Sequence, residues 1–380
     1  MGGEIISMVE KHDFVSRYLL QRFVCELLPD SRVHVCRRWK VPGDSTKILY
    51  NDQYKSALYG GLMTCGLNWL CPVCGSKIAE RRSNDLANGL NNHMGDLTMY
   101  TLTMRHKRED KLKDNIDIIT DAYRQLTHGK WWMKFKAEHG LVGQVSNLEI
   151  KWGFPSGWHP HKHILFLWKE KLSEEEQDQI TVQLQNRFHQ CVINYGGSGI
   201  ATIECFQSER KSTRADVIAW YISKYDDFPK TRVFGVEDEL TRIHTKDRGH
   251  YSYWQLLEMW GNTLLADENG EINHEKRLYR DLIREYAEAT RGERTIRFSP
   301  YVRDLMGANA VLTDMEIASE TREKARLLIA LSDQLWQKIV ANELRGKVLQ
   351  AANDNPDGIH EYIRDLTIQL IGKDSDYGNV

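Results

Sequence analysis

The sequence lacks a run of apolar residues that is long enough to cross a membrane. A membrane-spanning helix needs about 20 such residues, and the longest apolar stretch in these 380 residues is far shorter. The opening MGGEIISMVEKHDF also lacks the basic-then-apolar order of a secretion signal, and Ile6 stands where a myristoylation motif has Ser or Thr. We therefore expect a cytoplasmic protein with no membrane partner.

The chain also lacks a strong excess of charge of either sign. Its 51 Lys and Arg residues face 53 Asp and Glu residues, for a net charge of −2, so overall charge does not mark a nucleic-acid binder. Hydrophobic residues make up 41% and charged residues 27%, as in ordinary globular proteins. There is no internal repeat or low-complexity tract, and the length predicts two or three structural units.

Seven cysteines, an odd number without an export signal, argue against a disulfide framework. The motif Cys71-Pro-Val-Cys74 has the spacing that wraps a turn around one zinc ion, and Cys65 is a third thiolate nearby. Cys36 is the candidate for the fourth ligand. A redox-active CxxC is the rival interpretation, but the strand and helix context of a thioredoxin is missing. The cysteines therefore predict a structural Zn²⁺ site.

The helix predicted after this motif carries a group of basic residues. These side chains would contact a DNA backbone or, equally in keeping with the pattern, form an ordinary solvated face. The residues are Lys77, Arg81 and Arg82.

The middle of the chain alternates between strand and helix patterns. The order suits an antiparallel sheet backed by helices, the split βαβ class. The expected strands are 97–105, 145–152, 157–168 and 200–206, and the expected helices are 112–137, 173–195 and 213–225.

The ends of the chain have different patterns. The first ninety-odd residues show no long helical period, whereas the chain beyond Gly235 is mostly helical, with Thr313 and Glu316 expected to cap a long helix toward Leu349. We therefore expect an α+β protein with an N-terminal zinc-binding unit (1–95), an antiparallel-sheet domain (96–230) and a mostly helical C-terminal region (231–380).

The segment Gly157–Trp168 reads GWHPHKHILFLW. In a strand, His159, His161 and His163 project from one face and Lys162 from the other. A hairpin with the preceding strand brings Glu149 beside His161 and His163, and such a set suits Mg²⁺ or Mn²⁺. The alternative is a surface strand with incidental histidines, in which the Glu149 carboxylate pairs with a neighbouring lysine.

The segment TRADVIAWYISKYDDF predicts a helix with Tyr221 and Tyr225 on one side. An aromatic stripe at this spacing is common in a protein core. Beside a metal-bound phosphate, however, a phenolate can attack phosphorus, and Lys224 would assist that attack. Both interpretations stay open on spacing alone.

Together, the motifs TLTMRH, LEIKW, GWHPHKHILF and YISKY resemble those of rolling-circle replication initiators of bacterial plasmids, in the HUH endonuclease superfamily. The resemblance extends from about Cys36 to Gly307. It implies a ferredoxin-like nuclease core and a metal-dependent enzyme that nicks and rejoins single-stranded or hairpin origin DNA. The covalent intermediate would be a 5′-phosphotyrosine, with Tyr225 as main nucleophile. Host helicase and replication proteins are the implied partners, in a bacterial cytoplasm.

The sequence departs from the superfamily pattern at two positions. Lys162 stands where the middle of the His-x-His motif is usually hydrophobic, and Tyr221 stands where some initiators have a glutamate, which favours a two-tyrosine mechanism. A two-tyrosine transposase is an alternative, whereas a relaxase is disfavoured because its tyrosine usually precedes the histidines. A zinc-containing DNA-binding regulator without nuclease activity is the alternative from another class.

Overall fold

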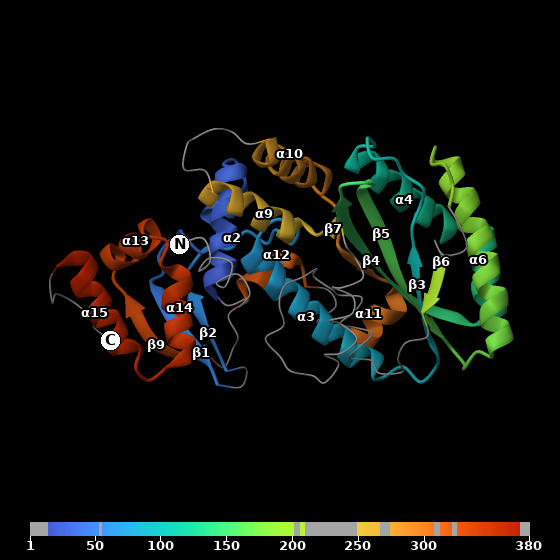
Figure 1. Ribbon diagram of the computed structural model, residues 1–380. Coiled ribbons are helices and arrows are strands. Elements are labelled where there is room, and N and C mark those ends of the chain that lie inside the picture. The colour runs from blue at the N-terminus through green and yellow to red at the C-terminus, as the bar shows by residue number, and fades with distance from the viewer. Residues whose placement is uncertain are drawn as a thin grey trace.

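The computed structural model describes residues 14–52, 55–200, 206–209, 249–266, 274–307, 312–320 and 325–372. It shows one large and one small antiparallel sheet with helices packed on both (Figure 1). The strands are β1 (Thr46–Asn51), β2 (Ser56–Gly60), β3 (Leu97–Leu102), β4 (Leu141–Gly153), β5 (Gly157–Trp168), β6 (Phe206–Glu209), β7 (His250–Tyr251), β8 (Ile296–Phe298) and β9 (Ala325–Leu331). The helices are α2 (Phe14–Leu27), the 3₁₀ turn η1 (Arg32–Val35), α3 (Pro72–Leu90), α4 (Leu112–Leu126), α5 (Gly129–His139), α6 (Glu174–Asn194), α9 (Tyr253–Ala266), α10 (His274–Ala289), α11 (Pro300–Met306), α12 (Asp314–Ser319), α13 (Asp333–Ala341), α14 (Arg345–Asp354) and α15 (Ile359–Ile371).

The large sheet has the strand order β6-β3-β5-β4, and β7 and β8 pair with the outer edge of β4. This is the order of two interleaved βαβ units. The prediction of an antiparallel α+β fold is confirmed. Helices α4 and α6 pack on one face of the sheet and α3 and α11 on the other (Figure 1). Because both faces are covered, the second half of β5 is apolar on both sides.

Strands β4 and β5 form a long hairpin at the centre of this sheet. Its turn ends at Gly157, whose φ of +73° favours glycine. A Cβ at this position would also lie 2.5 Å from the carbonyl oxygen of Arg108. The turn fixes the register that pairs Glu149 with His161 and Asn147 with His163.

The small sheet joins the two ends of the chain. The hairpin β1-β2 is completed by β9, which pairs with β1, and α13, α14 and α15 pack on this sheet. The expected long helix from Thr313 toward Leu349 is therefore wrong. The capping box of Thr313 and Glu316 forms, but it opens only the short α12, and the chain continues as β9 and then as two separate helices. The three-part division of the chain stays a prediction.

The first ninety residues contain two long helices, α2 and α3, so the expectation of no long helical period there is wrong. Helix α2 buries residues on several sides, including Tyr18, Leu20 and Phe23, and therefore has no single apolar stripe. The expected helix 112–137 is two helices, since α4 ends before Thr127 and α5 begins at Gly129. The capping box of Ser173 and Glu176 is confirmed at the start of α6.

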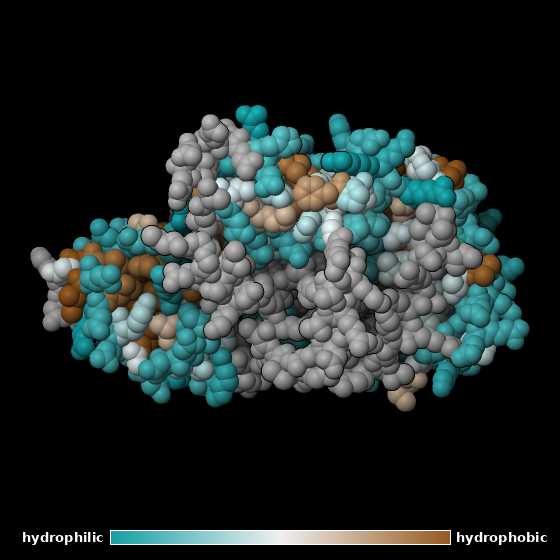
Figure 2. Space-filling model, in the orientation of Figure 1, coloured by the Kyte–Doolittle hydropathy of each residue, from teal (hydrophilic) through white to brown (hydrophobic). Residues whose placement is uncertain are grey.

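The sheets and helices form an elongated body. Helices α13, α14 and α15 lie at one end and α6 at the other, with α2, α3 and α9 between (Figure 1). The face seen in Figure 2 is mainly hydrophilic over α6, and hydrophobic surface shows at the opposite end of the molecule. Leu327 of β9 and Ile368 of α15 are among the exposed large hydrophobic residues. Among the described residues, no helix combines the length and the apolar character that a membrane crossing requires.

Candidate functional site

The four predicted cysteine ligands lie together at the start of α3. Cys71 is the N-cap residue of this helix and Cys74 lies in its first turn, where the helix dipole favours thiolates. Cys36 follows η1, and Cys65 lies between β2 and α3. All four are buried, with their sulfur atoms within 4.8 Å of one another. The sequence therefore identified the complete set, including Cys36.

The sulfur spacing fits a metal site. Sγ of Cys36 lies 3.4 Å from Sγ of Cys74 and 3.7 Å from Sγ of Cys71, and Cys65 Sγ lies 3.7 Å from Cys74 Sγ. A disulfide requires about 2.05 Å, whereas a tetrahedral site with Zn–S bonds of ~2.3 Å places the sulfurs about 3.8 Å apart. The cluster could therefore hold a structural zinc ion.

The basic residues of α3 do not form a solvated DNA-binding face. Lys77 donates to the backbone carbonyl of Ala318 at 3.1 Å, Arg81 pairs with Glu320 at 2.9 Å, and Arg82 lies 3.4 Å from Asp314. These contacts tie α3 to α12 and the residues beside it. The expected role of these side chains on a DNA backbone has no support in the structure.

The histidines predicted to share a strand face do so. His159, His161 and His163 alternate along β5 opposite Lys151, Glu149 and Asn147 of β4. Directly opposed residues of antiparallel strands point to the same face, so the two strands bring the three histidines and Glu149 together. Glu149 is only 8% exposed, so it is not an exposed strand residue, but the pairing with a neighbouring lysine that this alternative predicts does form, with Lys151.

His163 is held on both sides of its ring. Its Nδ1 atom lies 3.0 Å from Thr101 Oγ1 on β3, and its Nε2 atom contacts Glu149 Oε2. The other Glu149 oxygen lies 3.2 Å from Lys151 Nζ. A metal-binding histidine is usually oriented by such a hydrogen bond to its second nitrogen. Thr101 therefore orients the His163 ring toward Glu149.

Charge and burial prepare these groups to bind a cation. Burial lowers the pKa of His161 well below its ordinary value, and His159 lowers it further, so the imidazole is neutral and able to ligate. Burial would raise the pKa of Glu149, but His163 and Lys151 outweigh it and hold that pKa well below the ordinary value. Nδ1 of His161 is buried without a hydrogen-bond partner.

The ligand atoms of the histidine site are not yet gathered as in a metal complex. In the part of the chain that the structure describes, the four cysteines are the group that brings three or more His, Cys, Asp or Glu ligand atoms within 4.8 Å of one another. At the histidine site, Glu149 and His163 contact each other directly. Binding of a cation by both of these side chains would require them to separate.

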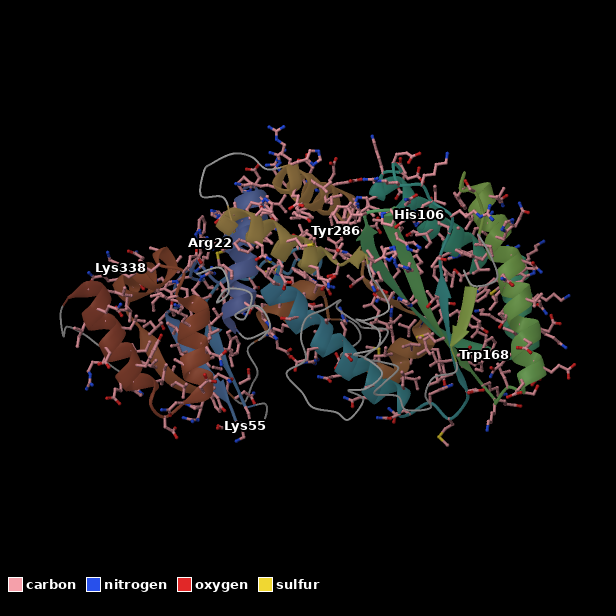
Figure 3. The ribbon with its side chains drawn as sticks, viewed as in Figure 1. Arg22, Lys55, His106, Trp168, Tyr286 and Lys338 are labelled. Carbon is pink, nitrogen blue, oxygen red and sulfur yellow. The ribbon has the colours of Figure 1, made fainter. Side chains whose placement is uncertain are left out.

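Two further histidines extend this face, and the sequence analysis did not assign them to the site. The ring of His106 lies 4.5 Å from that of His159, and the ring of His250 lies 6.0 Å from His159. Figure 3 shows His106 near one end of the sheet and Trp168, which ends β5, near the other. His106 belongs to the TLTMRH motif, which could have indicated that it is a site residue. His250 lies far along the chain, and no motif around it indicates such a role.

A cavity opens beside Glu149, between β4 and the segment that follows Cys65. Aromatic, aliphatic and amide side chains share its walls with Arg82 and Glu149, a mixture of apolar and polar groups that is usual in ligand-binding cavities. Its lining includes Asn68, Trp69, Asn147, Tyr253, Trp254 and Tyr286.

Lys162, which departs from the superfamily pattern, is buried on the opposite face of β5. It is 4% exposed, and its Nζ atom lies 5.5 Å from the centre of the Tyr123 ring of α4. Burial, with a smaller contribution from Arg297, lowers the pKa of Lys162 from 10.5 to about 8. The lysine therefore occupies a core position and does not face the histidines.

Replacing Lys162 by methionine should stabilise the protein. Below pH 8 the lysine is protonated in both the folded and the unfolded state. Burial of its charge lowers the free energy of unfolding by about 3 kcal/mol, as the difference between the pKa values of 10.5 and about 8 implies. The unfolded state binds more protons between pH 8 and 10.5, so wild-type stability should rise across that window. Urea unfolding should give K162M a free energy of unfolding about 3 kcal/mol higher than that of the wild type at pH 7, and nearly the same value at pH 10.5. An exposed control, K134M, should change by less than about 0.5 kcal/mol; a K162M gain that is independent of pH would contradict the assignment.

The predicted nucleophiles Tyr221 and Tyr225, together with Lys224, lie outside the described residues. The helix expected at 213–225 lies there too. Their roles stay predictions.

Comparison with known proteins gives one extended match. The chain is similar to the "Protein rep" of Streptomyces lividans, with 23% identity over 380 aligned positions that cover 80% of each chain. A shorter match, 28% identical over 134 positions, covers 28% of this chain and 31% of the "Neomycin resistance protein" of Streptomyces cyanogenus. No family model matches, and no solved structure matches. The first match is a distant relationship that spans most of both proteins.

Proposed function

We propose that this protein initiates rolling-circle replication of a plasmid by nicking and rejoining single-stranded origin DNA. The observation that carries the proposal is the central β-hairpin, which brings Glu149 beside His161 and His163 on one face of the sheet. The distant similarity to Protein rep, over 80% of each chain, supports the same assignment from an independent direction.

The histidine face would hold the catalytic cation. Glu149, His161 and His163 would supply its ligands, and a bound Mg²⁺ or Mn²⁺ would polarise the scissile phosphate. The residues around them prepare the site without the ion. Thr101 orients His163, and Lys151 keeps a positive charge beside Glu149, close to where a DNA phosphate would lie.

The nucleophile would come from the predicted helix 213–225. Attack by the Tyr225 phenolate on phosphorus breaks the bond to the 3′ oxygen and forms a 5′-phosphotyrosine, which stores the ester bond for rejoining. Lys224 would offset the negative charge that develops on the phosphoryl group. Tyr221 would perform the second transfer while Tyr225 carries DNA.

Two features near the histidines suit an unpaired strand. The exposed side chains of Arg105, Lys107 and Arg108 lie in the sequence next to His106, and they would contact phosphates. The cavity beside Glu149 is lined in part by the half-buried Trp69, on which an unstacked base could lie. Only this second feature favours single-stranded or hairpin DNA over a regular duplex, because basic side chains bind the phosphates of both. Host helicase and replication proteins would then extend the free 3′ end.

The test is a search for the covalent intermediate. The full-length protein would be incubated with 3′-labelled single-stranded oligonucleotides that tile its own replicon, with Mg²⁺ or Mn²⁺ and, in parallel, with EDTA. We expect a labelled protein band on a denaturing gel in the presence of metal, because the downstream 5′ end stays on tyrosine. If no oligonucleotide forms an adduct, the proposed nicking activity is contradicted and a zinc-containing DNA-binding regulator is favoured. Adducts that form instead only with oligonucleotides from transposon ends, assayed in parallel, would favour the two-tyrosine transposase.

A further inference from the structure

A fully buried arginine lies behind the cysteine cluster. Arg345 begins α14 and is 0% exposed. Burying a guanidinium is unfavourable unless its charge and its N–H groups find partners. Its partners therefore indicate what keeps it there.

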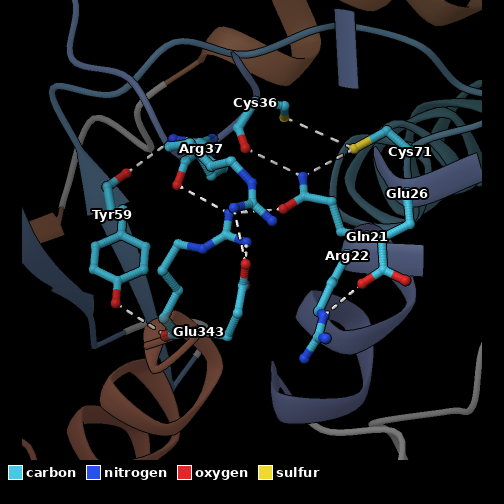
Figure 4. Close-up of polar contacts among 10 residues, drawn as sticks. Gln21, Arg22, Glu26, Cys36, Arg37, Tyr59, Cys71 and Glu343 are labelled. Atoms are coloured by element: carbon cyan, nitrogen blue, oxygen red, sulfur yellow. Dashed lines mark hydrogen bonds and ion pairs between the residues drawn. The ribbon is translucent and has the colours of Figure 1, made fainter. Parts of the chain in front are cut away.

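The Arg345 guanidinium reaches the loop that carries Cys36. Its Nη1 atom donates to Gln21 Oε1 at 2.8 Å and to the backbone oxygen of Arg37 at 3.2 Å, and Nη2 lies 3.0 Å from Glu343 Oε2. The guanidinium carbon also lies 4.8 Å from the centre of the Tyr18 ring. Figure 4 draws the hydrogen bonds that join the guanidinium to Gln21, to the backbone oxygen of Arg37 and to Glu343.

Gln21 links Arg345 to the cysteine cluster, because its side chain contacts both. Because its oxygen accepts from Arg345, its amide nitrogen faces the other way. That nitrogen lies 3.5 Å from Cys71 Sγ and donates to the backbone oxygen of Cys36 at 3.2 Å (Figure 4). A hydrogen-bond donor next to sulfur stabilises the thiolate form that binds metal. Gln21 is itself completely buried, so no water competes for these contacts.

Charge also balances across this region. Four thiolates around one Zn²⁺ carry a formal charge of −2. On the Arg345 side lie the cations of Arg345, Arg37 and Arg38 and the one carboxylate of Glu343, which bridges Arg38 at 2.9 Å and Arg345 at 3.0 Å. The formal charge of that group is +2. In a buried region of low dielectric constant, such complementary charges interact strongly.

The same contacts fasten two distant parts of the chain. We call residues 325–372, which comprise β9 and α13 to α15, the C-terminal lobe. Besides Arg345, the indole nitrogen of Trp336 donates to the backbone oxygen of Arg38 at 2.9 Å, and Lys40 pairs with Asp333 at 2.5 Å. The C-terminal lobe is therefore bonded to the segment that directly follows Cys36.

We propose that Arg345 and Gln21 are positioning residues of the cysteine-bound metal, and that through them an occupied metal site holds the C-terminal lobe in place. The coupling is reciprocal. If the metal stabilises the docked lobe, docking raises metal affinity by the same factor. The proposal concerns the cysteine site alone and does not depend on the DNA-cleaving activity.

Three substitutions test this proposal in the full-length protein. Arg345→Met removes the charge and keeps much of the aliphatic volume. Gln21→Glu keeps the partner of Arg345 but places an acceptor where Cys71 needs a donor, and it provides the test even if R345M does not fold. Arg326→Met is the matched control in the same lobe, since Arg326 is exposed, pairs with the surface carboxylates of Asp52 and Asp357, and lies over the ring of Tyr50. Cys71→Ser marks the loss of the site.

Two measurements decide the outcome. Zinc competition against a chelating indicator should show affinity about 10- to 100-fold weaker for R345M and Q21E, with R326M unchanged. The thiolate-to-metal absorption bands of the Co²⁺-substituted protein should shift in Q21E. Metal removal should accelerate amide hydrogen exchange in α14 of the wild type and R326M, with little change in α6. Wild-type affinity in Q21E, α14 exchange that is indifferent to metal, or a wild-type protein that binds no zinc would each overturn the proposal.

Discussion

Replacing His163 by alanine should abolish cleavage of single-stranded DNA, with a rate loss of at least about a thousandfold. The substitution removes the imidazole that lies between Thr101 and Glu149. A metal ion stabilises transition-state charge by several kcal/mol, and each 1.36 kcal/mol is a factor of ten in rate. DNA binding should weaken by less than about tenfold, because most phosphate contacts in such complexes come from other residues. Cleavage of a labelled oligonucleotide and its affinity would be measured side by side.

Two variants of neighbouring residues test whether the effect is specific to His163. Thr101→Val keeps the shape of the side chain and removes only the hydrogen bond to His163 Nδ1, so cleavage should fall by about 10- to 100-fold. His159→Ala removes a histidine of the same face that lies opposite Lys151 and not opposite Glu149, and it should have a smaller effect than either. A parallel loss of binding and cleavage in H163A would assign His163 to DNA contact. Equal losses in H159A and H163A would point to a general histidine surface.

Local patterns predicted much of this site because local rules govern it. Strand alternation and a short turn are enough to place Glu149 beside His161 and His163, since a one-residue slip would turn every side chain to the other face. The cysteine spacing likewise predicted the cysteine cluster, because Cys71 and Cys74 lie in one helical turn. Capping boxes predicted the starts of α6 and α12 for the same reason.

The failures come from pairings between distant segments. Nothing near Ala325–Leu331 indicates that it will pair with β1, almost 280 residues earlier, so the sequence predicts a helix where the chain forms a strand. Lys77, Arg81 and Arg82 have the pattern of a solvated basic face, but α12 and the residues beside it cover them. The network of Arg345 and Gln21 spans 324 residues of sequence. Propensity and spacing carry no information about such contacts.

The burial of Lys162 shows how a departure from a family pattern can be structural. The strand period alone places its side chain away from the histidines, and the packing of Tyr123 over it explains how the sheet accommodates a lysine at a core position. The departure therefore leaves the histidine face intact. The substitution of Tyr221 for a glutamate is different, because it changes a group expected to take part in the reaction.

Tyr225→Phe should eliminate the covalent adduct, with a loss of cleavage on the order of 10⁴-fold or more, because phenylalanine keeps the ring and lacks only the nucleophilic oxygen. Tyr221→Phe should still nick DNA and form the adduct. Rejoining should fail in this variant, since the second transfer needs a free phenol while Tyr225 carries the DNA. The measurements are adduct formation with a 3′-labelled oligonucleotide and joining of a second, differently labelled strand to the cleaved end.

The pair of variants separates two mechanisms that the spacing of the tyrosines leaves open. If the phenotypes exchange, Tyr221 makes the first cut and the two-tyrosine mechanism stands. If Y221F nicks and rejoins like the wild type, Tyr221 belongs to an aromatic core stripe, which a four-residue spacing on a helix equally predicts. A water molecule would then make the second cut, and it would need a general base. Glu149 would not serve, because its carboxylate is engaged by His163 and Lys151 on the histidine face. His106 and His250, beside His159, would become the first residues to test for that role.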